Sequence, residues 1–352
     1  MLGKVLFLRK YCAWALPGAG MHRLIFGLSL LAAGAAGMAP ASAAAACGPL
    51  KMVASTELVE RERNQFMVPV VINGTPTHFL VDTGGVFTQI SPRMASALKL
   101  QFEAGATRVF DVSGNASGAY VKVDTMTMGG MTGRNVYLRV LPTNMLADGI
   151  VAPDTMKRFD VEMDFAGQKM NYFLPDHCFG KVVYWPHGDV AQISINLADQ
   201  AWIKVPVTID GKSFLAIIDT GATGTIISTD TAKEEFGLDA SSPGMEPAGN
   251  INNDPNLASH RYRFSTLTLD GITVKNPNIL IMPDRLTDAF AKTGQRMRKK
   301  AALPEVTLGM NVLKHLHLYF SFAEHRLYVT AGSVPAPAAE AAPATAAAET
   351  RR

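Results

Sequence analysis

The chain has 352 residues, of which 48% are hydrophobic, and this is enough to build two domains with separate cores. Charged residues make up 18% and the formal net charge is +3, which argues against a nucleic-acid partner. The mild basicity favours no particular class of substrate.

Residues 1–46 are predicted to be a signal peptide and not part of the fold. A basic start at Met21–Arg23 precedes an apolar run and an Ala-rich cleavage segment, so Met21 is an alternative start of the chain. The run is short for a membrane span, although an uncleaved anchor is an alternative. These features predict export to the periplasm, with a membrane-anchored form facing the periplasm or a secreted form as alternatives.

Residues 47–175 are expected to form a first lobe that begins with two strands and a tight turn. Asn73-Gly74 separates two apolar segments and tolerates the positive φ of a hairpin. The second strand runs into Phe79–Ser91, FLVDTGGVFTQIS, which predicts a buried strand, a sharp turn carrying Asp82, and another buried strand. Burying an ionised Asp among apolar side chains is costly unless other groups hold it.

Residues 176–190 are predicted to be a linker, because Pro, Gly and His interrupt both the helical and the strand periodicity. Tyr184 and Trp185 in this linker are expected to lie against one lobe. Residues 331–352 are rich in Ala and Pro and are predicted to be a disordered tail.

Residues 191–330 repeat the first lobe. Ala216–Ser228 reads AIIDTGATGTIIS, and its Asp219 lies 137 residues after Asp82. Later in each half an apolar segment, a short helix start and an alternating hairpin follow one another, with Asp154 matching Asn311. This internal repeat predicts an all-β fold of two homologous lobes.

These segments resemble the aspartic peptidases, in the retropepsin-like (retroviral-type) branch found in bacterial exported proteins. In that family each lobe supplies an apolar-apolar-Asp-Thr-Gly loop, here Leu80–Gly84 and Ile217–Gly221, and later an apolar-apolar-Gly brace. Thr307–Gly309 matches the brace in the second half. The first half departs from the pattern at Ala152 and Gly85. The resemblance covers nearly all of the mature chain.

The resemblance implies an all-β fold of two homologous retropepsin-like or pepsin-like β-barrel lobes, related by a pseudo-two-fold axis and carrying short helices. It also implies an aspartic endopeptidase in which Asp82 and Asp219 are the catalytic residues. Two carboxyl groups that meet this closely share a proton, so one is ionised and the other protonated. The ionised member takes a proton from a water that attacks the peptide carbonyl, and the protonated member donates to the developing oxyanion. No cofactor and no metal are expected, and the partner is a peptide or protein substrate.

The family also implies supporting roles for the other residues of the two loops. Gly84 and Gly221 let the backbone turn and approach the water. Thr83 and Thr220 are each expected to hydrogen-bond into the opposite loop. Because one chain supplies both lobes, a monomer is expected.

A non-catalytic periplasmic peptide-binding or scaffolding protein with the same fold is the alternative. Repulsion between two facing carboxylates favours the enzyme, because a binding protein would gain stability by losing either Asp.

Cys47 and Cys178 remain after removal of the predicted signal peptide, and an exported chain with two cysteines often joins them. We therefore predict a disulfide that ties the mature N-terminus to the linker. Unpaired thiols, or a lipidated Cys47 that anchors the protein to a membrane, are the alternatives.

Substrate-covering hairpins, or flaps, are predicted from small, Gly-rich segments. In the first half Phe110 and Gly114 belong to such a segment, and Gly244–Pro255 is the counterpart in the second half; ordinary surface loops are the alternative. His315 and His317 could form a metal pair, but no third ligand is evident, so we expect both on a solvated strand face.

Overall fold

The computed structural model describes residues 47–111, 115–195, 202–250, 258–283 and 305–332, whose strands form three sheets. The predicted signal peptide and the Ala/Pro-rich tail lie outside these residues. The short helices are α1 (Pro92–Ala97), α2 (Pro153–Met156), α3 (Thr229–Phe236), α5 (Met310–Leu313) and the 3-10 turn η1 (Glu62–Asn64). In this described part of the chain, no helix is both long and apolar enough to cross a membrane.

The first half forms an eight-stranded sheet in the order β2-β3-β4-β9-β5-β8-β7-β6. Its strands are β2 (Val59–Arg61), β3 (Gln65–Ile72), β4 (Thr75–Val81), β5 (Gln89–Ile90), β6 (Phe102–Phe110), β7 (Ala116–Met128), β8 (Met131–Val140) and β9 (Gly149–Val151).

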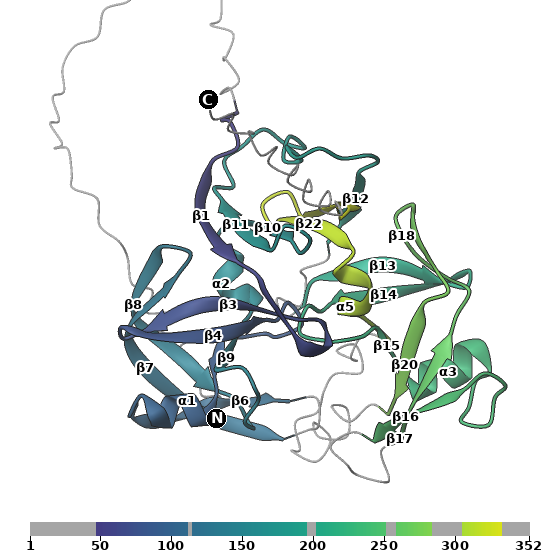
Figure 1. Cartoon of the computed structure of the whole chain (residues 1–352), viewed down its shortest axis with the longest axis horizontal. Coiled ribbons are helices and arrows are strands. Elements are labelled where there is room, and N and C mark those ends of the chain that lie inside the picture. Colours follow the sequence, from purple (N-terminus) through teal and green to yellow (C-terminus); the bar gives the residue numbers. More distant parts are fainter. Residues whose placement is uncertain (1–46, 112–114, 196–201, 251–257, 284–304, 333–352) are drawn as a thin grey trace, which may run out of the picture. The chain divides into compact units, whose positions relative to one another are not determined.

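The second half forms a nine-stranded sheet in the order β16-β17-β20-β15-β21-β14-β13-β18-β19. Its strands are β13 (Lys204–Ile209), β14 (Lys212–Ile218), β15 (Ile226–Ser228), β16 (Glu246–Asn250), β17 (Ala258–Arg263), β18 (Thr266–Leu269), β19 (Ile272–Lys275), β20 (Asn278–Met282) and β21 (Val306–Leu308). Figure 1 shows the strands of each half grouped together, purple to blue for the first and teal to yellow-green for the second.

Each of the two sheets contains the same arrangement of five strands around its Asp loop. The order β3-β4-β9-β5-β8 of the first half matches β13-β14-β21-β15-β20 of the second, with the same parallel and antiparallel pairings. The predicted hairpin turns are confirmed: φ is 48° at Asn73 and 82° at Gly74, and 44° at Asp210 and 82° at Gly211. Equivalent serines also begin α1 and α3. The internal duplication read from the sequence is thus present in the fold.

The outer strands of the two sheets differ. In the first half β7 is one strand of 13 residues that pairs with β8 and also with β3. In the second half separate strands make these contacts, because β17 pairs with β20 while β18 pairs with β13. The repeat is therefore closest around the Asp loops and looser at the sheet edges.

A third sheet joins the two halves. Its order is β1-β11-β10-β22-β23-β12, from β1 (Met52–Glu57), β10 (Asp160–Asp164), β11 (Lys169–Phe173), β12 (Ala191–Ser194), β22 (Leu316–Ser321) and β23 (Arg326–Ala331). The predicted alternating hairpins are present as β10–β11 and β22–β23, and they meet at an antiparallel pair with Val161 opposite Phe320. The two lobes are thus continuous through one sheet (Figure 1).

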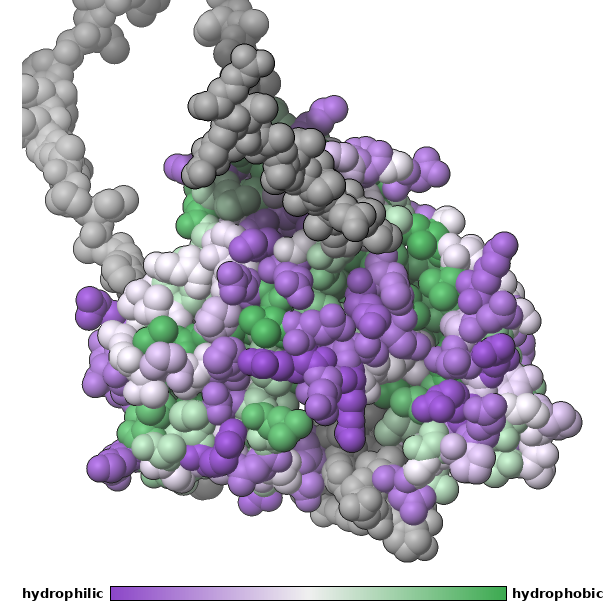
Figure 2. Space-filling view, viewed as in Figure 1, coloured by the Kyte–Doolittle hydropathy of each residue, from purple (hydrophilic) through white to green (hydrophobic). Residues whose placement is uncertain are grey.

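The core consists of the apolar faces of these sheets, and one large cluster of buried side chains runs through both halves. The exposed large hydrophobic residues are spread over several elements, including Tyr137 on β8 and Leu146 and Leu215 elsewhere. On the face shown in Figure 2, hydrophobic residues lie in small groups among hydrophilic ones.

Candidate active site

Each candidate catalytic Asp lies at the end of a buried strand, and its backbone is held by the next parallel strand. Asp82 follows β4, and its N–H donates to the Val151 carbonyl at 2.9 Å. Asp219 follows β14, and its N–H donates to the Leu308 carbonyl at 3.0 Å. The first loop (residues 82–85) and the second loop (residues 219–222) therefore start from matching positions of the two sheets.

A reciprocal hydrogen-bond network joins the two loops through buried threonines. The Thr83 hydroxyl donates to the Ile218 carbonyl at 2.7 Å and accepts the Thr220 N–H at 3.0 Å. The Thr220 hydroxyl donates to the Val81 carbonyl at 2.7 Å and accepts the Thr83 N–H at 3.1 Å. Both side chains have no exposed surface, so each hydroxyl satisfies a buried donor and a buried acceptor of the opposite loop.

The glycine of each loop faces the carboxyl group of the other loop. A Cβ atom added to Gly84 would lie 2.3 Å from Cγ of Asp219, and one added to Gly221 would lie 2.6 Å from Oδ1 of Asp82. A side chain at either position would therefore displace a carboxyl group. The structure thus brings together all six loop residues singled out in the sequence.

The carboxyl groups of Asp82 and Asp219 are joined by a hydrogen bond. Both residues are partly exposed to solvent. Oδ1 of Asp219 accepts the N–H groups of Gly221 at 2.8 Å and Ala222 at 3.0 Å, whereas Oδ1 of Asp82 accepts the Gly85 N–H at 2.9 Å.

The pKa values of the two acids are shifted to different extents. Burial raises the pKa of Asp82 well above its ordinary value, and the negative charge of Asp219 raises it further. Burial also raises the pKa of Asp219, and backbone N–H groups oppose the rise at both acids. The hydrogen bond between the two carboxyl groups raises the pKa of Asp82 further but lowers that of Asp219. The pKa of Asp82 is therefore raised further than that of Asp219, and the two acids titrate as a pair.

A brace behind each loop fixes its far end. In the first half Oδ1 of Asp154 accepts both the N–H and the hydroxyl of Thr88, and that hydroxyl in turn accepts the Ala152 N–H at 3.1 Å. We call residues 152–154 the first brace. Sequence reasoning paired Asp154 with Asn311 but missed Thr88, although the repeat places a Thr at the same offset in both halves.

The second brace, residues 309–311, makes the same contacts with Asn311 in place of the acid. Oδ1 of Asn311 accepts the N–H and the hydroxyl of Thr225, which accepts the Gly309 N–H at 3.2 Å. Here the glycine is required, because a Cβ atom at Gly309 would lie 2.2 Å from the Gly224 carbonyl oxygen. The Met310 N–H also donates to the Ala222 carbonyl at 2.8 Å.

Two contacts across the halves had no counterpart in the sequence reasoning. The Trp202 indole N–H donates to the Gly84 carbonyl at 2.8 Å, and the Asn64 amide donates to the Thr223 carbonyl at 3.3 Å. Each residue lies near the first strand of one half and reaches the Asp loop of the other. The repeat gave no signal for them, because Gln65, at the repeat offset from Trp202, is chemically unlike it.

The predicted flap of the first half corresponds to the hairpin of β6 and β7. Phe110 is the last residue of β6 and lies opposite Ala116, while Gly114 lies outside the described residues. In the second half the hairpin of β16 and β17 holds part of the predicted counterpart; the remainder, from 251 onward, is not described. The flap assignments therefore stay predictions.

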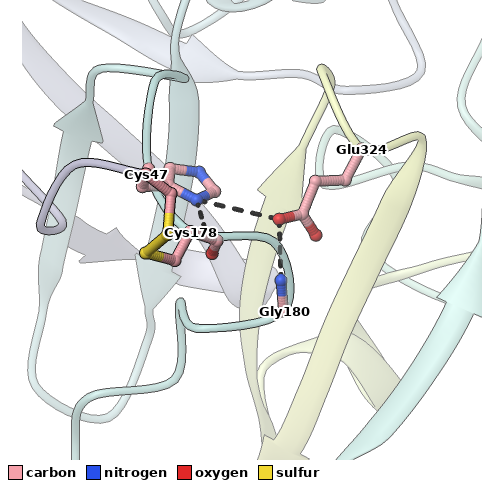
Figure 3. Close-up of a disulfide and its surroundings, with 5 residues drawn as sticks. Cys47, Cys178, Gly180 and Glu324 are labelled. Carbon is pink, nitrogen blue, oxygen red and sulfur yellow. Dashed lines mark hydrogen bonds and ion pairs between the residues drawn. A yellow bond between two sulfur atoms is a disulfide. The ribbon is translucent and has the colours of Figure 1, made fainter. Parts of the chain in front are cut away.

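Cys47 and Cys178 form a disulfide with a sulfur–sulfur distance of 1.93 Å (Figure 3). The neighbouring His177 ring binds Oδ2 of Asp160 through Nε2 at 2.6 Å, and both side chains are buried. Glu324 of the second half accepts the Gly180 N–H at 2.9 Å (Figure 3). The disulfide thus ties the start of the described chain to a linker that contacts both halves.

The linker also corrects the prediction for His317. His315 is exposed as expected, but His317 is buried, with Nε2 at 2.8 Å from Oε1 of Glu162. The Trp185 ring stacks on the His317 ring at 3.9 Å between centroids, and Tyr184 donates to Glu162 at 2.7 Å. The strand pattern placed His317 on the polar face of the sheet, and that face is covered by the linker and not by solvent.

Tyr184 and Trp185 also differ from the prediction that they lie against one lobe. Their hydrogen bonds reach Glu162 of the first half and Thr330 of the second. Within the described residues, no group of three His, Cys, Asp or Glu side chains is placed to hold a metal ion.

Comparison with known families identifies the repeated unit. The model of the family described as aspartyl protease matches residues 68–154 and again residues 205–312, so each match includes one Asp loop and its brace. No curated protein matches the chain. The chain therefore belongs to the retropepsin-like aspartyl protease family, with the family domain present twice in one polypeptide.

Proposed function

We propose that the protein is an aspartic endopeptidase that hydrolyses peptide bonds between its two lobes. The observation that carries this proposal is that the carboxyl groups of Asp82 and Asp219, both partly exposed residues, lie together and share a hydrogen bond. Holding two acids together costs stability, because burial and mutual repulsion both disfavour their charged forms. Catalysis explains why both acids are present, because the reaction needs a general acid and a general base in one site.

The two acids have different roles in the proposed reaction. Asp219, whose Oδ1 is held by two backbone N–H groups, is the ionised member and takes a proton from the attacking water. Asp82, whose pKa is raised further, is protonated and donates to the oxygen of the peptide carbonyl as it becomes tetrahedral. Asp219 then donates the proton taken from water to the departing amine, and the new hydroxyl returns its proton to Asp82 as the C–N bond breaks. Hydrolysis is thus complete without a covalent intermediate, and both acids are back in their starting states.

The proposal includes a position for the substrate and a location for the enzyme. The β6–β7 hairpin, with Phe110 near its end, covers a peptide lying across the two loops. The Cys47–Cys178 disulfide supports an oxidising compartment such as the periplasm. We infer a monomer, since one chain holds both Asp loops.

The test is cleavage of a mixed peptide library between pH 3 and pH 8 by the full exported chain. We expect cleavage by the wild type, inhibition by a transition-state peptide analogue, and loss of at least about 1,000-fold in kcat/KM for Asp82→Asn and for Asp219→Asn. Asp124→Asn is the matched control, because Asp124 is exposed on β7.

Two results would overturn the proposal. The first is turnover that survives either dyad substitution, since the mechanism needs both acids. The second is the absence of turnover by the folded wild type at every pH, with peptides still bound, which would identify a peptide-binding protein.

A further inference from the structure

The two halves differ at one matched position beside the Asp loops. In the first half Arg139 of β8 lies opposite Gln89 of β5 in parallel pairing. In the second half Leu280 of β20 lies opposite Ile226 of β15 in the same pairing. Because Gln89 and Ile226 are related by the repeat offset, Arg139 and Leu280 occupy equivalent sites.

Arg139 connects the segment after Asp82 to the flap hairpin. Its guanidinium lies 4.5 Å from the ring centroid of Phe87, and its Nη1 donates to the Thr107 carbonyl of β6 at 3.0 Å. The Arg139 side chain is partly exposed. The cation therefore lies between a residue five positions after Asp82 and the hairpin proposed to cover the substrate.

The charge of Arg139 has no carboxylate partner within salt-bridge distance among the described residues. The acids of the neighbouring hairpin are bound elsewhere: Glu103 accepts from the Tyr120 hydroxyl at 2.6 Å, and Asp111 accepts from Asn115 at 2.9 Å. A guanidinium with free donors suits a carboxylate, which it can bind through two parallel hydrogen bonds.

The equivalent site of the second half is smaller and apolar. Gly224 takes the place of Phe87 there, and a Cβ atom added to Gly224 would lie 3.5 Å from Cδ1 of Leu280. Leu280 is partly exposed, as Arg139 is. One side of the dyad therefore offers a cation and the other an aliphatic surface.

We propose that Arg139 is a specificity-determining residue that selects an acidic substrate side chain on the first-half side of the scissile bond. Leu280 receives an apolar side chain on the other side. This inference rests on the proposed peptidase function and adds the substrate class to it.

The geometry of an extended peptide is compatible with this assignment. Phe87 is the fifth residue after Asp82, which limits their Cα separation to about 18 Å. A peptide rises about 3.3 Å per residue, so the third residue from the scissile bond lies about 10 Å from it, which is within this limit.

The test compares peptides that differ only by Glu or Gln at each of the three positions on either side of the cleaved bond. It is run near pH 6, above the ordinary Glu pKa of about 4.3, so that the side chain is charged. We expect kcat/KM to rise about tenfold or more for Glu over Gln at one position, on one side of the bond only.

Three variants identify Arg139 as the cause. Arg139→Leu, which copies the second half, is expected to reduce the Glu-to-Gln ratio to about one. Arg139→Glu is expected to invert the preference in favour of Lys, and Arg139→Lys to retain part of the preference for Glu. If the role of Arg139 were merely structural, the variants would lower kcat/KM for all peptides alike and leave the Glu-to-Gln ratio unchanged.

The two proposals fail in different ways. Cleavage by the wild type with no Glu preference, or with a preference that Arg139→Leu leaves intact, overturns the inference and leaves the peptidase function standing. If the wild type cleaves nothing, the peptidase proposal fails, and binding of the same peptides decides the inference. In that case equal affinity of the wild type for Glu and Gln peptides overturns it.

Discussion

The second Asp loop is held by more backbone contacts than the first. Asp219 accepts two backbone N–H groups, and the Met310 N–H ties the loop to the second brace through the Ala222 carbonyl. Asp82 accepts the Gly85 N–H, and the residue equivalent to Met310 is Pro153, which has no N–H to donate. The Asp loop of the second half is therefore held more firmly than the Asp loop of the first half.

The first half departs from the family pattern at two positions, one in the Asp loop and one in the brace behind it. In the second half the loop has Ala222 and the brace has Gly309; in the first half the loop has Gly85 and the brace has Ala152. A Cβ atom at Gly85 would lie 2.9 Å from Oδ2 of Asp82. The methyl group therefore lies on the loop in the second half and on the brace in the first half.

The largest expected effect comes from exchanging the brace residues. Gly309→Ala should lower the free energy of unfolding by about 3 kcal/mol, because the new Cβ atom would meet a backbone oxygen at 2.2 Å. Ala152→Gly should cost only about 1 kcal/mol, from added backbone entropy. Denaturant unfolding of both variants measures this, and equal losses would show that the braces are equivalent.

The next effect tests whether the threonine network is symmetric although the loops are not. Thr83→Val and Thr220→Val each leave a buried N–H and a buried carbonyl without a partner, so each should cost about 2 kcal/mol or more. The corresponding Ser variants keep the hydroxyl and serve as controls. A difference above about 1 kcal/mol between the two Val variants would mean that one loop depends on the network more than the other.

A smaller effect is expected from exchanging the brace acid and amide. Nδ2 of Asn311 donates to the Asn278 carbonyl at 3.0 Å, so Asn311→Asp would place two acceptors together and cost about 1 kcal/mol. Asp154→Asn keeps the oxygen that accepts from Thr88 and should change stability by less than about 0.5 kcal/mol. Thermal unfolding near pH 6 compares them; a larger loss for Asp154→Asn would reverse this order.

The smallest effects concern the pH dependence of stability. The pKa values of Asp82, Asp219, Asp154 and Asp160 are raised, chiefly by burial. A raised acid pKa means that the native state binds more protons than the unfolded state, so stability should fall as the pH rises above about 3.8.

His177 acts in the same direction. Burial lowers its pKa, but hydrogen bonds to Asp160 and to the Cys178 carbonyl outweigh burial and give a net rise. Its contribution to stability is present below pH 6.5 and is lost above it. Melting temperatures should therefore be higher at pH 4 than at pH 7, and Asp82→Asn should remove more of this slope than Asp219→Asn; the opposite order would contradict the assignment of the shared proton to Asp82.

Most of the fold around the Asp loops could be predicted because the repeat consists of short sequence patterns, namely hairpin turns and apolar strands. Asn73-Gly74 and Asp210-Gly211 adopt the positive φ that hairpins need, and the strands before each Asp are apolar at every buried position except Thr77. The loop residues were found by the same repeat. These features depend on short-range backbone chemistry, which a single sequence records.

The remainder depends on which distant surfaces meet, and the sequence carries little record of that. The period-two patterns of β10 and β22 predicted hairpins but not that Val161 would lie opposite Phe320 in one sheet. The burial of His317 follows from a linker whose path has no periodic signal. Trp202 reaches Gly84 across the halves, and no local pattern indicates that contact.

The shared sheet has a consequence for how the chain is completed during synthesis. β10 of the first half can pair with β22 only after the ribosome has made residues beyond 316. Until then one edge of β10 has no partner strand. A truncation that removes the last hairpin would therefore damage the half that contains Asp82 as well as its own.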